Sequence, residues 1–291
     1  MGLGTNGLTT TSESAFVAKM WSKETQRQAE AAKVMANLVK DYSNQTSMKG
    51  DTIHYQTISN LTATAKAVNT QVSLQAPSET DNTISINRYF ESSFLVEKSL
   101  AVQTQFDVMT EYTSKAAESI ERQKDSDLTG LYSSLTQAVG GLGGAVTEAN
   151  FVRCIQYLDD ANAPQDDRHF VIRPVAKADL LKINKFTGIT VGADATSPGT
   201  VRTMNIVANG LFGELYGVQV HVTTQVAADA TTATLYHNLV FHREAFTLAE
   251  QISTTSETQY KQEYIGTLHS AYGLWGRAVY RGTFGVDFRS S

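Results

Sequence analysis

The sequence predicts an α+β protein, with helices and mostly antiparallel strands arranged in blocks. Three observations carry this prediction. Segments 52–55 and 83–87 alternate polar and apolar residues, as strands with one covered face do. A long amphipathic helical pattern follows over Leu100–Val139. Beyond it, shorter elements follow one another without regular strand–helix–strand alternation and without an internal repeat.

The N-terminal region comes first. Residues 1–13 are rich in glycine, threonine and serine, so we expect a mobile arm there. A helix is predicted from Ser14, with apolar residues such as Met20 and Val34. Its middle, residues 23–30, is strongly polar, so this helix either lies on a surface or breaks in two.

Residues 50–94 predict a long two-stranded ribbon with arms at Thr52–Tyr55 and Thr83–Asn87. The stretch between the arms is polar and has little to bury. An isolated two-stranded ribbon is marginally stable in water. Arms of roughly fifteen residues, at about 3.3 Å per residue, would reach on the order of 50 Å. We therefore expect the ribbon to lie on another copy of the protein.

The helix predicted over Leu100–Val139 would span roughly 60 Å at about 1.5 Å per residue, longer than a compact domain needs. The glycine-rich segment Gly140–Gly144 is expected to end it as a cap or hinge. Apolar residues recur along the helix at spacings of three, four or their sums: Phe106, Met109, Ala116, Ile120, Leu128, Leu131, Leu135 and Val139.

The second half of the chain predicts short elements and one long loop. In order, these are a helix from Thr147 that carries Phe151 to Leu158, a buried strand His169–Ile172 closed by Pro174, a helix Lys177–Lys185, a loop Thr187–Thr200, strands Val218–Val222 and Leu235–His242, and closing strands Arg277–Tyr280 and Phe284–Phe288.

The composition of the chain excludes several classes of function. With 24 basic and 29 acidic residues the net charge is −5, so a basic groove for nucleic acid is not indicated. The single cysteine, Cys154, excludes an intramolecular disulfide and a multi-cysteine zinc site, and we expect it to be a small core residue. No stretch is apolar enough to span a membrane, and the N-terminus does not resemble a signal peptide.

The motifs that chemistry would need are missing or incomplete. Gly140–Gly144 lacks the lysine and hydroxyl ending of a phosphate-binding loop and follows a predicted helix instead of a strand. His237 and His242 lie five residues apart on a predicted strand, which points them to opposite faces. The acidic residues around 159–167 fit no calcium-loop spacing and are expected to form a solvated loop. We predict no catalytic residue, cofactor or metal.

The residues singled out as candidates for contacts between copies are Lys66, Arg88, Glu118 and Arg122. Lys66 is the only basic residue between His54 and Arg88, near the middle of the ribbon. Its alternative role is a solubilising charge on an edge strand. Glu118 and Arg122 have the spacing of a helical surface pair, which would contribute little unless it faced a neighbour.

The order of these parts, together with several short sequence segments, resembles that of the major capsid proteins of tailed bacteriophages, which share the Hong Kong 97-type fold. The resemblance covers nearly the whole chain, and the order of the parts carries it more than any single motif. The matching segments are Phe16–Ser22, Gly50–Ile53, Ile84–Asn87, Asp125–Leu128, Tyr272–Arg281 and Gly285–Val286.

The resemblance implies a division of the chain. Residues 1–49 would form the N-terminal arm, 50–94 the extended loop over the adjacent subunit, and 95–146 the peripheral domain with its spine helix. Residues 147–250 would form the axial domain around five-fold and quasi-six-fold axes. Residues 251–291 would complete the peripheral sheet, with the last strand either staying there or returning to the axial domain.

The resemblance also implies partners. Copies would assemble as hexamers and pentamers into an icosahedral shell in the host cytoplasm, enclosing double-stranded DNA without sequence-specific binding and without a membrane. Scaffolding, portal and decoration proteins, or a processed N-terminal segment, stay open. Some family members join subunits through a lysine–asparagine bond. Lys66 could be such a lysine, but no asparagine follows Asn238, so we predict no cross-link.

Three hypotheses therefore stand. The leading one is the capsid protein of a tailed double-stranded DNA phage. The second is the shell protein of an encapsulin-like cellular nanocompartment with the same fold. The third is a soluble α+β enzyme with an unrecognised site, which would have to explain the projecting ribbon. Another virion protein, such as a tail component, is a further alternative.

Overall fold

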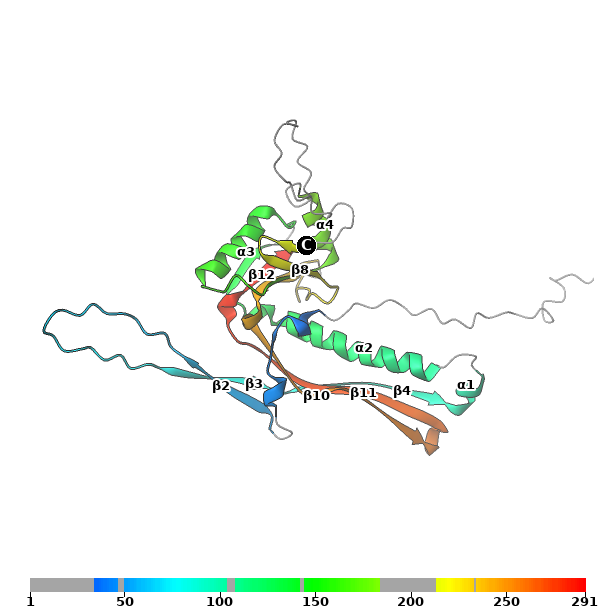
Figure 1. The fold of residues 1–291 in the computed structure, drawn as a ribbon. Helices are drawn as coiled ribbons and strands as arrows, with labels where there is room; N and C mark the ends of the chain where they lie inside the picture. The colour runs from blue at the N-terminus through cyan, green and yellow to red at the C-terminus, as the bar shows by residue number, and fades with distance from the viewer. Residues whose placement is uncertain (1–33, 47–49, 104–107, 142–143, 184–212, 233) are drawn as a thin grey trace, which may run out of the picture.

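The computed structural model describes residues 34–46, 50–103, 108–141, 144–183, 213–232 and 234–291. The predicted mobile arm, the helix expected from Ser14 as far as residue 33, and the predicted loop Thr187–Thr200 lie outside these residues. The described part contains a four-stranded sheet, a six-stranded sheet and a separate two-stranded ribbon (Figure 1). This confirms the α+β prediction.

The four-stranded sheet is elongated and has one helix along it. Its strand order is β1 (Lys40–Asp41), β10 (Phe246–Lys261), β11 (Gly266–Val279) and β4 (Arg88–Glu97). β10, β11 and β4 are antiparallel, whereas β1 runs parallel to β10. The helix α2 (Val108–Thr129) packs on this sheet (Figure 1). Strand β10 was not predicted from the sequence.

The long helix is shorter than predicted. A short α1 (Lys98–Gln103) precedes α2, and α2 ends at Thr129 rather than Val139. The chain then makes a 3-10 turn and a strand, β5 (Gln137–Gly140), which pairs in parallel with the last strand of the chain. The apolar residues at the end of the predicted helix do face the core, but they lie in a turn and a strand. The segment is a strand because pairing with the last strand satisfies the backbone hydrogen bonds of β5.

Gly140 is therefore not a helix cap, as the sequence suggested, but the end of β5. Its φ is +87°, a value suited to glycine. A Cβ at this position would lie 2.3 Å from the carbonyl oxygen of Arg289 on the paired strand. The glycine is required by a close backbone approach and not by the end of a helix.

The six-stranded sheet is covered on one face by α3 (Glu148–Asp160), whose buried Phe151 stacks on Phe170. The side chain of Thr147 caps α3 as predicted, but α4 runs over Pro174–Lys182, so Pro174 begins a helix rather than closing a strand. The strand order is β5, β12 (Gly285–Ser290), β9 (Tyr236–His242), β6 (Arg168–Ile172), β8 (Val218–Val222) and β7 (Glu214–Leu215).

The last strand, β12, joins this six-stranded sheet between β5 and β9 and does not extend the four-stranded one. A continuous cluster of buried side chains links the two sheets. The connections also contain short 3-10 helices at Met35–Asn37 (η1), Ser43–Gln45 (η2), Gly130–Ser134 (η3), Arg243–Ala245 (η4), Gln262–Tyr264 (η5) and Gly282–Phe284 (η6).

The predicted ribbon is present and projects from the body of the molecule (Figure 1). Its strands are β2 (Thr52–Ile58) and β3 (Glu79–Ser85), paired antiparallel with Ile53 opposite Ile84. The chain between them is exposed and has no strand assignment. Ribbon pairing ends at Ser85, because the next strand, β4, belongs to the four-stranded sheet.

Candidate assembly surfaces and sites

The root of the ribbon is anchored to the body by aromatic packing. Tyr55 on β2 lies 5.0 Å from Tyr280 and 6.0 Å from Tyr42, measured between ring centroids. Lys40 completes the cluster, with its ammonium 4.6 Å from the centre of the Tyr280 ring. Burial, and next the neighbouring Tyr280, raise the pKa of Tyr55. The ribbon therefore leaves the body in a direction that the subunit itself fixes.

Strand β3 is held at the same place by close backbone packing. Ile84 is fully buried, and a Cβ on Gly276 of β11 would lie only 2.6 Å from the carbonyl oxygen of Ser85. Because only a glycine permits this approach, Gly276 allows the ribbon root to lie directly on β11.

Beyond its root, the ribbon exposes apolar side chains that no described part of the subunit covers. The exposed fraction reaches 97% at Val68 and 94% at Leu74, and Ile58, Leu61 and Val72 are also exposed. Lys66, the predicted contact residue, is exposed in the same segment. Asn238 is buried and donates hydrogen bonds to the Phe288 carbonyl and the Ser290 hydroxyl, and the absence of a cross-link to Lys66 stays a prediction.

Arg88, a second predicted contact residue, is instead bound within the subunit. It lies at the start of β4, and its Nε donates to Asp127 Oδ2 of α2 at 2.8 Å. Asp127 also accepts from Gln123 and from the indole of Trp275. Burial alone would raise the pKa of Asp127, but the hydrogen bond from Arg88 and the charge of Arg277 hold it below its usual value.

Lys124 forms a buried ionic cluster that the sequence did not reveal. It is 1% exposed, and its ammonium lies 2.9 Å from Glu121 and 3.0 Å from Glu250 on β10. It also donates to Thr254 at 3.0 Å. Its burial ties α2 to the four-stranded sheet.

Asp125 is buried next to this cluster and holds the N-terminal segment. Its carboxylate accepts hydrogen bonds from the backbone N–H groups of Val34, at 2.6 Å, and Ala36, at 3.2 Å. Burial raises the pKa of Asp125, and these hydrogen bonds oppose that rise. Asp125 and Asp127, which both lie in the segment Asp125–Leu128 of α2, thus each hold a different part of the chain against this helix.

The predicted Glu118–Arg122 pair is less informative. Glu118 lies 3.3 Å from Lys115, one turn earlier on α2, and is 43% exposed. Arg122 is half-buried. Their role in contacts between copies stays a prediction.

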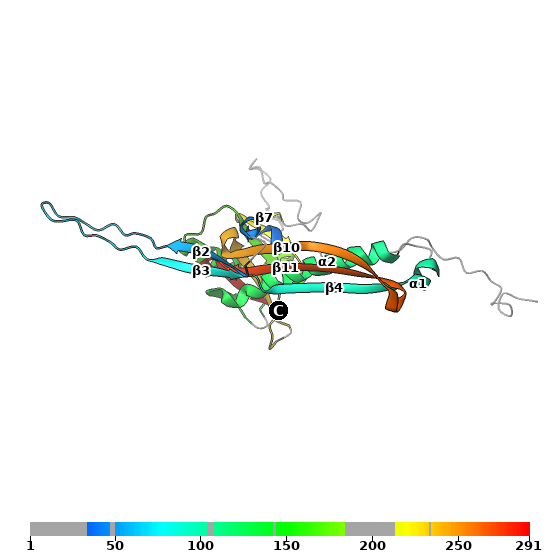
Figure 2. The same cartoon turned by 90° about the horizontal axis from the view of Figure 1, so that it is seen from below.

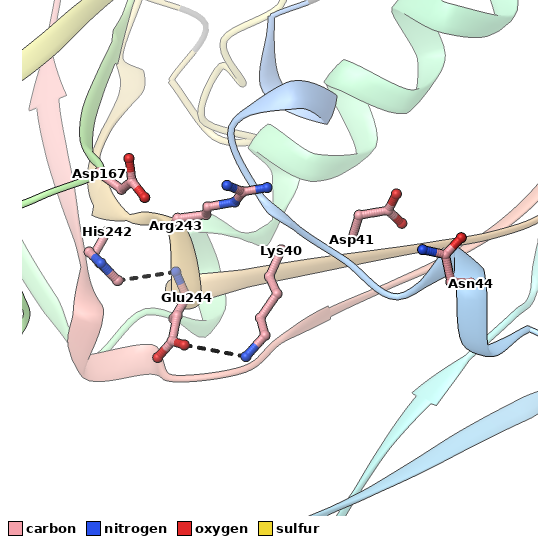
Figure 3. Close-up of a pocket in the computed structure, with 7 residues that line it drawn as sticks. All are labelled: Lys40, Asp41, Asn44, Asp167, His242, Arg243 and Glu244. Carbon is pink, nitrogen blue, oxygen red and sulfur yellow. Dashed lines mark hydrogen bonds and ion pairs between the residues drawn. The ribbon is translucent and has the colours of Figure 1, made fainter.

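A polar pocket of about 470 Å³ lies where β1 meets the turn between β9 and β10 (Figure 3). Lys40 pairs with Glu244 at 3.3 Å, and the Glu244 N–H donates to His242 Nδ1 at 3.2 Å. The lining mixes cations, carboxylates and an amide without a nucleophile hydrogen-bonded to a base. Its residues are Lys40, Asp41, Asn44, Asp167, His242, Arg243 and Glu244.

The histidines do not assemble a metal centre: among the described residues no group of three or more potential ligands could hold an ion. His237 stacks on Tyr132 and bonds to Asp287, whereas His242 contacts Phe284. His169 lies beside His221, and burial, and next that neighbour, lower the pKa of His169 to about 4.

Cys154 is buried in the core as predicted, and burial raises the pKa of its thiol, so it is not activated as a nucleophile. In the predicted acidic loop, Asp159 pairs with the buried Arg168 at 2.7 Å. No helix in the described part of the chain is long and apolar enough to cross a membrane.

Comparison with solved structures identifies the fold. The chain superimposes on a chain of Mycobacterium phage Che8 with a TM-score of 0.76 and 22% identity, covering 94% of this chain and 97% of that one. The capsid structure of the Cyanophage P-SCSP1u gives 0.76 and 15%, over 100% and 97%. The capsid of a native GTA particle gives 0.68 and 13%, over 99% and 100%.

No protein-family model and no curated protein matches the sequence. The structural likeness nevertheless extends over nearly the whole of each chain, ribbon and helix included. The chain therefore has the Hong Kong 97-type fold.

Proposed function

We propose that this chain is the major capsid protein of a tailed double-stranded DNA bacteriophage. Hexamers and pentamers of it close into an icosahedral shell that encloses the genome. The observation that carries the proposal is the ribbon: its root is built into the subunit, while its distal half exposes apolar side chains that no described part of the subunit covers. Whole-length likeness to capsid chains supports the same role.

Each part of the chain takes one structural role in the proposed capsid subunit. The segment at 1–49 acts as the N-terminal arm and 50–94 as the extended loop. The four-stranded sheet and α2 serve as the peripheral domain, and the six-stranded sheet, including β12, as the axial domain. The shell resides in the virion after assembly in the host cytoplasm, with scaffolding, portal and decoration proteins as further partners. Its weak net charge of −5 suits a container that does not bind the packaged DNA tightly.

The alternatives have less support. An encapsulin-like nanocompartment shares the fold, but the structural neighbours named above come from phage and gene-transfer particles. An enzyme would need a constellation of catalytic groups. In the polar pocket Lys40 pairs with Glu244, and the lining, which includes His242, holds no nucleophile hydrogen-bonded to a base.

The test is assembly of the purified protein, followed by negative-stain electron microscopy and sedimentation. We expect closed shells or capsomer rings from the full chain. A variant with residues 59–78 replaced by Asn-Gly should stay folded, because the ribbon root is self-contained, but should not form shells. Lys66→Ala keeps the ribbon at full length and separates the two roles considered for this lysine: weakened assembly would make it a contact residue, and normal assembly a solubilising charge. A chain that stays monomeric even with co-expressed scaffold would contradict the proposal.

A further inference from the structure

Two arginines lie at the C-terminal end of α2, where this helix meets the edge of the four-stranded sheet. Arg88 begins the edge strand β4 and pairs with Trp275 of β11, and Arg277 follows two residues later on the same face of β11. Figure 2 shows β4 along this edge, beside β11. Arg277 also lies against the residue that follows α2, because a Cβ on Gly130 would stand 3.2 Å from its Nη1. Adjacent strands therefore bring two guanidinium groups together beside the helix.

One carboxylate, that of Asp127, faces these two cations, and its oxygens are already fully used. Oδ1 accepts hydrogen bonds from Arg88 Nη2 at 2.5 Å and from Gln123 at 3.2 Å. Oδ2 accepts from Arg88 Nε at 2.8 Å and from the indole of Trp275 at 3.2 Å. The two oxygens of a carboxylate offer about four acceptor positions. Asp127 therefore has no acceptor position left for Arg277.

Arg277 has no hydrogen-bond acceptor among the described residues. Its Nη1 is buried without a partner, while the residue as a whole is partly exposed. Burial lowers the pKa of Arg277; the charge of Asp127 opposes that fall, and the charge of Arg88 adds to it. The negative end of the α2 dipole favours a cation at this place, but no carbonyl oxygen in the described part of the chain accepts from this guanidinium. A charged N–H that has lost water and gained no acceptor is costly to the fold.

We propose that Arg277, with Arg88 beside it, forms a site for an oxyanion, either a carboxylate or a phosphate group. A planar guanidinium presents paired N–H donors that match two oxygens of such a group. Because the site is partly buried, the attraction between the charges is screened less than it would be in open water. Arg88 adds its own charge and its Nη1, since only its Nε and Nη2 are bound to Asp127.

This oxyanion has two possible sources with the same chemistry. It is a free inorganic ion or the carboxylate of an acidic side chain on a neighbouring copy. The second source rests on the proposed shell function, whereas the first does not depend on it.

Thermal melting of the purified full chain, kept below the concentration at which it assembles, tests binding of a free ion. Sodium phosphate is compared with sodium chloride at equal ionic strength, so that screening is the same in both. Phosphate should raise the melting temperature, because it binds the folded subunit. Arg277→Gln should weaken phosphate binding by about tenfold or more. Arg153→Gln, at an exposed arginine on α3, is the matched control and should leave the gain from phosphate unchanged.

The stability of Arg277→Gln in chloride separates a binding site from a merely structural role. Glutamine removes a charge that has lost water without gaining an acceptor, so the variant should melt at the same temperature as the unaltered subunit or higher. If Arg277 only fastened β11 to the end of α2, R277Q would melt lower in chloride and would gain as much from phosphate as the unaltered subunit. That result would overturn the inference.

Assembly tests the second source. If phosphate does not stabilise the subunit, yet R277Q raises the protein concentration needed for shells by about tenfold or more while R153Q does not, the oxyanion is a carboxylate of a neighbouring copy. If R277Q changes neither the response to phosphate nor assembly, the oxyanion site is refuted and the proposed function stands. A chain that forms no shells under any condition refutes the proposed function, and phosphate binding alone then decides the inference.

Discussion

Replacing Asp127 with asparagine should destabilise the subunit strongly, although the two side chains have nearly the same shape. Asp127 is 4% exposed and is the shared acceptor for Arg88, Gln123 and Trp275. An asparagine would present an amide donor toward the guanidinium and leave that cation without its carboxylate. Removing one partner of a buried ion pair costs about 3–5 kcal/mol. Because Arg88 is itself 35% exposed, we expect about 2–4 kcal/mol here.

Urea and thermal unfolding of the purified subunit would measure this loss, which should lower the melting temperature by roughly 5–12 °C. Glu118→Gln is the matched control, because its ion pair with Lys115 lies on the helix surface and should contribute less than about 0.5 kcal/mol. A loss below about 1 kcal/mol for D127N would refute the reasoning that this carboxylate fastens β4 and β11 to α2.

The pH dependence of the same pair gives a second readout. The pKa of Asp127 is lowered in the folded subunit, so the unfolded chain binds its proton more readily. The stabilisation is therefore complete above the unfolded pKa of about 4 and is lost as the pH falls through the lower, folded pKa. The stability difference between the unaltered subunit and D127N should shrink on acidification below about pH 4. A difference that grew there would contradict the assignment.

Three further changes test other parts of the fold. Gly140→Ala should cost about 2–4 kcal/mol in urea unfolding, because its Cβ would lie 2.3 Å from the Arg289 carbonyl at a φ of +87°; a neutral result would contradict the close strand approach. Lys124→Met should cost about 2 kcal/mol by leaving two carboxylates without their cation, and an unchanged unfolding midpoint would contradict this. Burial and His221 lower the pKa of His169 to about 4, so stability should fall by up to about 3 kcal/mol from pH 6.5 to 4. His169→Gln should flatten that pH profile, and an unflattened profile would assign the acid loss to other groups.

The sequence predicted the elements in which period and burial agree. The ribbon arms alternate polar and apolar residues, and the buried strands around Phe170 and Val240 are short runs whose length and β-branched and aromatic residues favour a strand. The extent of the long helix was overestimated because Leu131, Leu135 and Val139 keep helical spacing even though they lie in a turn and a strand. Pairing of β5 with β12, 149 residues apart at Val286 and Gln137, decides that conformation, and local periodicity does not contain it.

Strand β10 escaped prediction for the opposite reason. Beyond Glu250 it is rich in threonine, serine, glutamine and glutamate, and most of its distal half is exposed. It is a strand because β11 pairs with it from Phe246 opposite Val279 to Lys261 opposite Gly266, with register shifts between Glu250 and Thr255. A polar strand whose order depends on its partner has little signal of its own.

The buried charges were the hardest part of the site to predict. Helical patterning assigns Lys124, Asp125 and Asp127 to a solvated face, because charged residues are rarely buried unless paired. Here each has partners from a distant segment: Glu250, the backbone of Val34 and Ala36, and Arg88. These partners are distant in the sequence and meet only in the folded chain. The helical pattern therefore predicts the helix but not the contacts of its charged residues.

The contrast between the root and the distal half of the ribbon bears on how a shell of this chain would close. Tyr55 and Gly276 fix the root within one subunit, so the ribbon direction need not be ordered when a neighbour arrives, and less conformational entropy is lost on binding. The distal half is polar apart from its scattered apolar side chains, so each contact with a neighbour is modest. A modest contact in a fixed direction allows misplaced subunits to dissociate, while repetition around the particle makes the closed shell stable. The stability of the shell would therefore depend on the fixed direction of the ribbon and on the number of contacts more than on the affinity of any single interface.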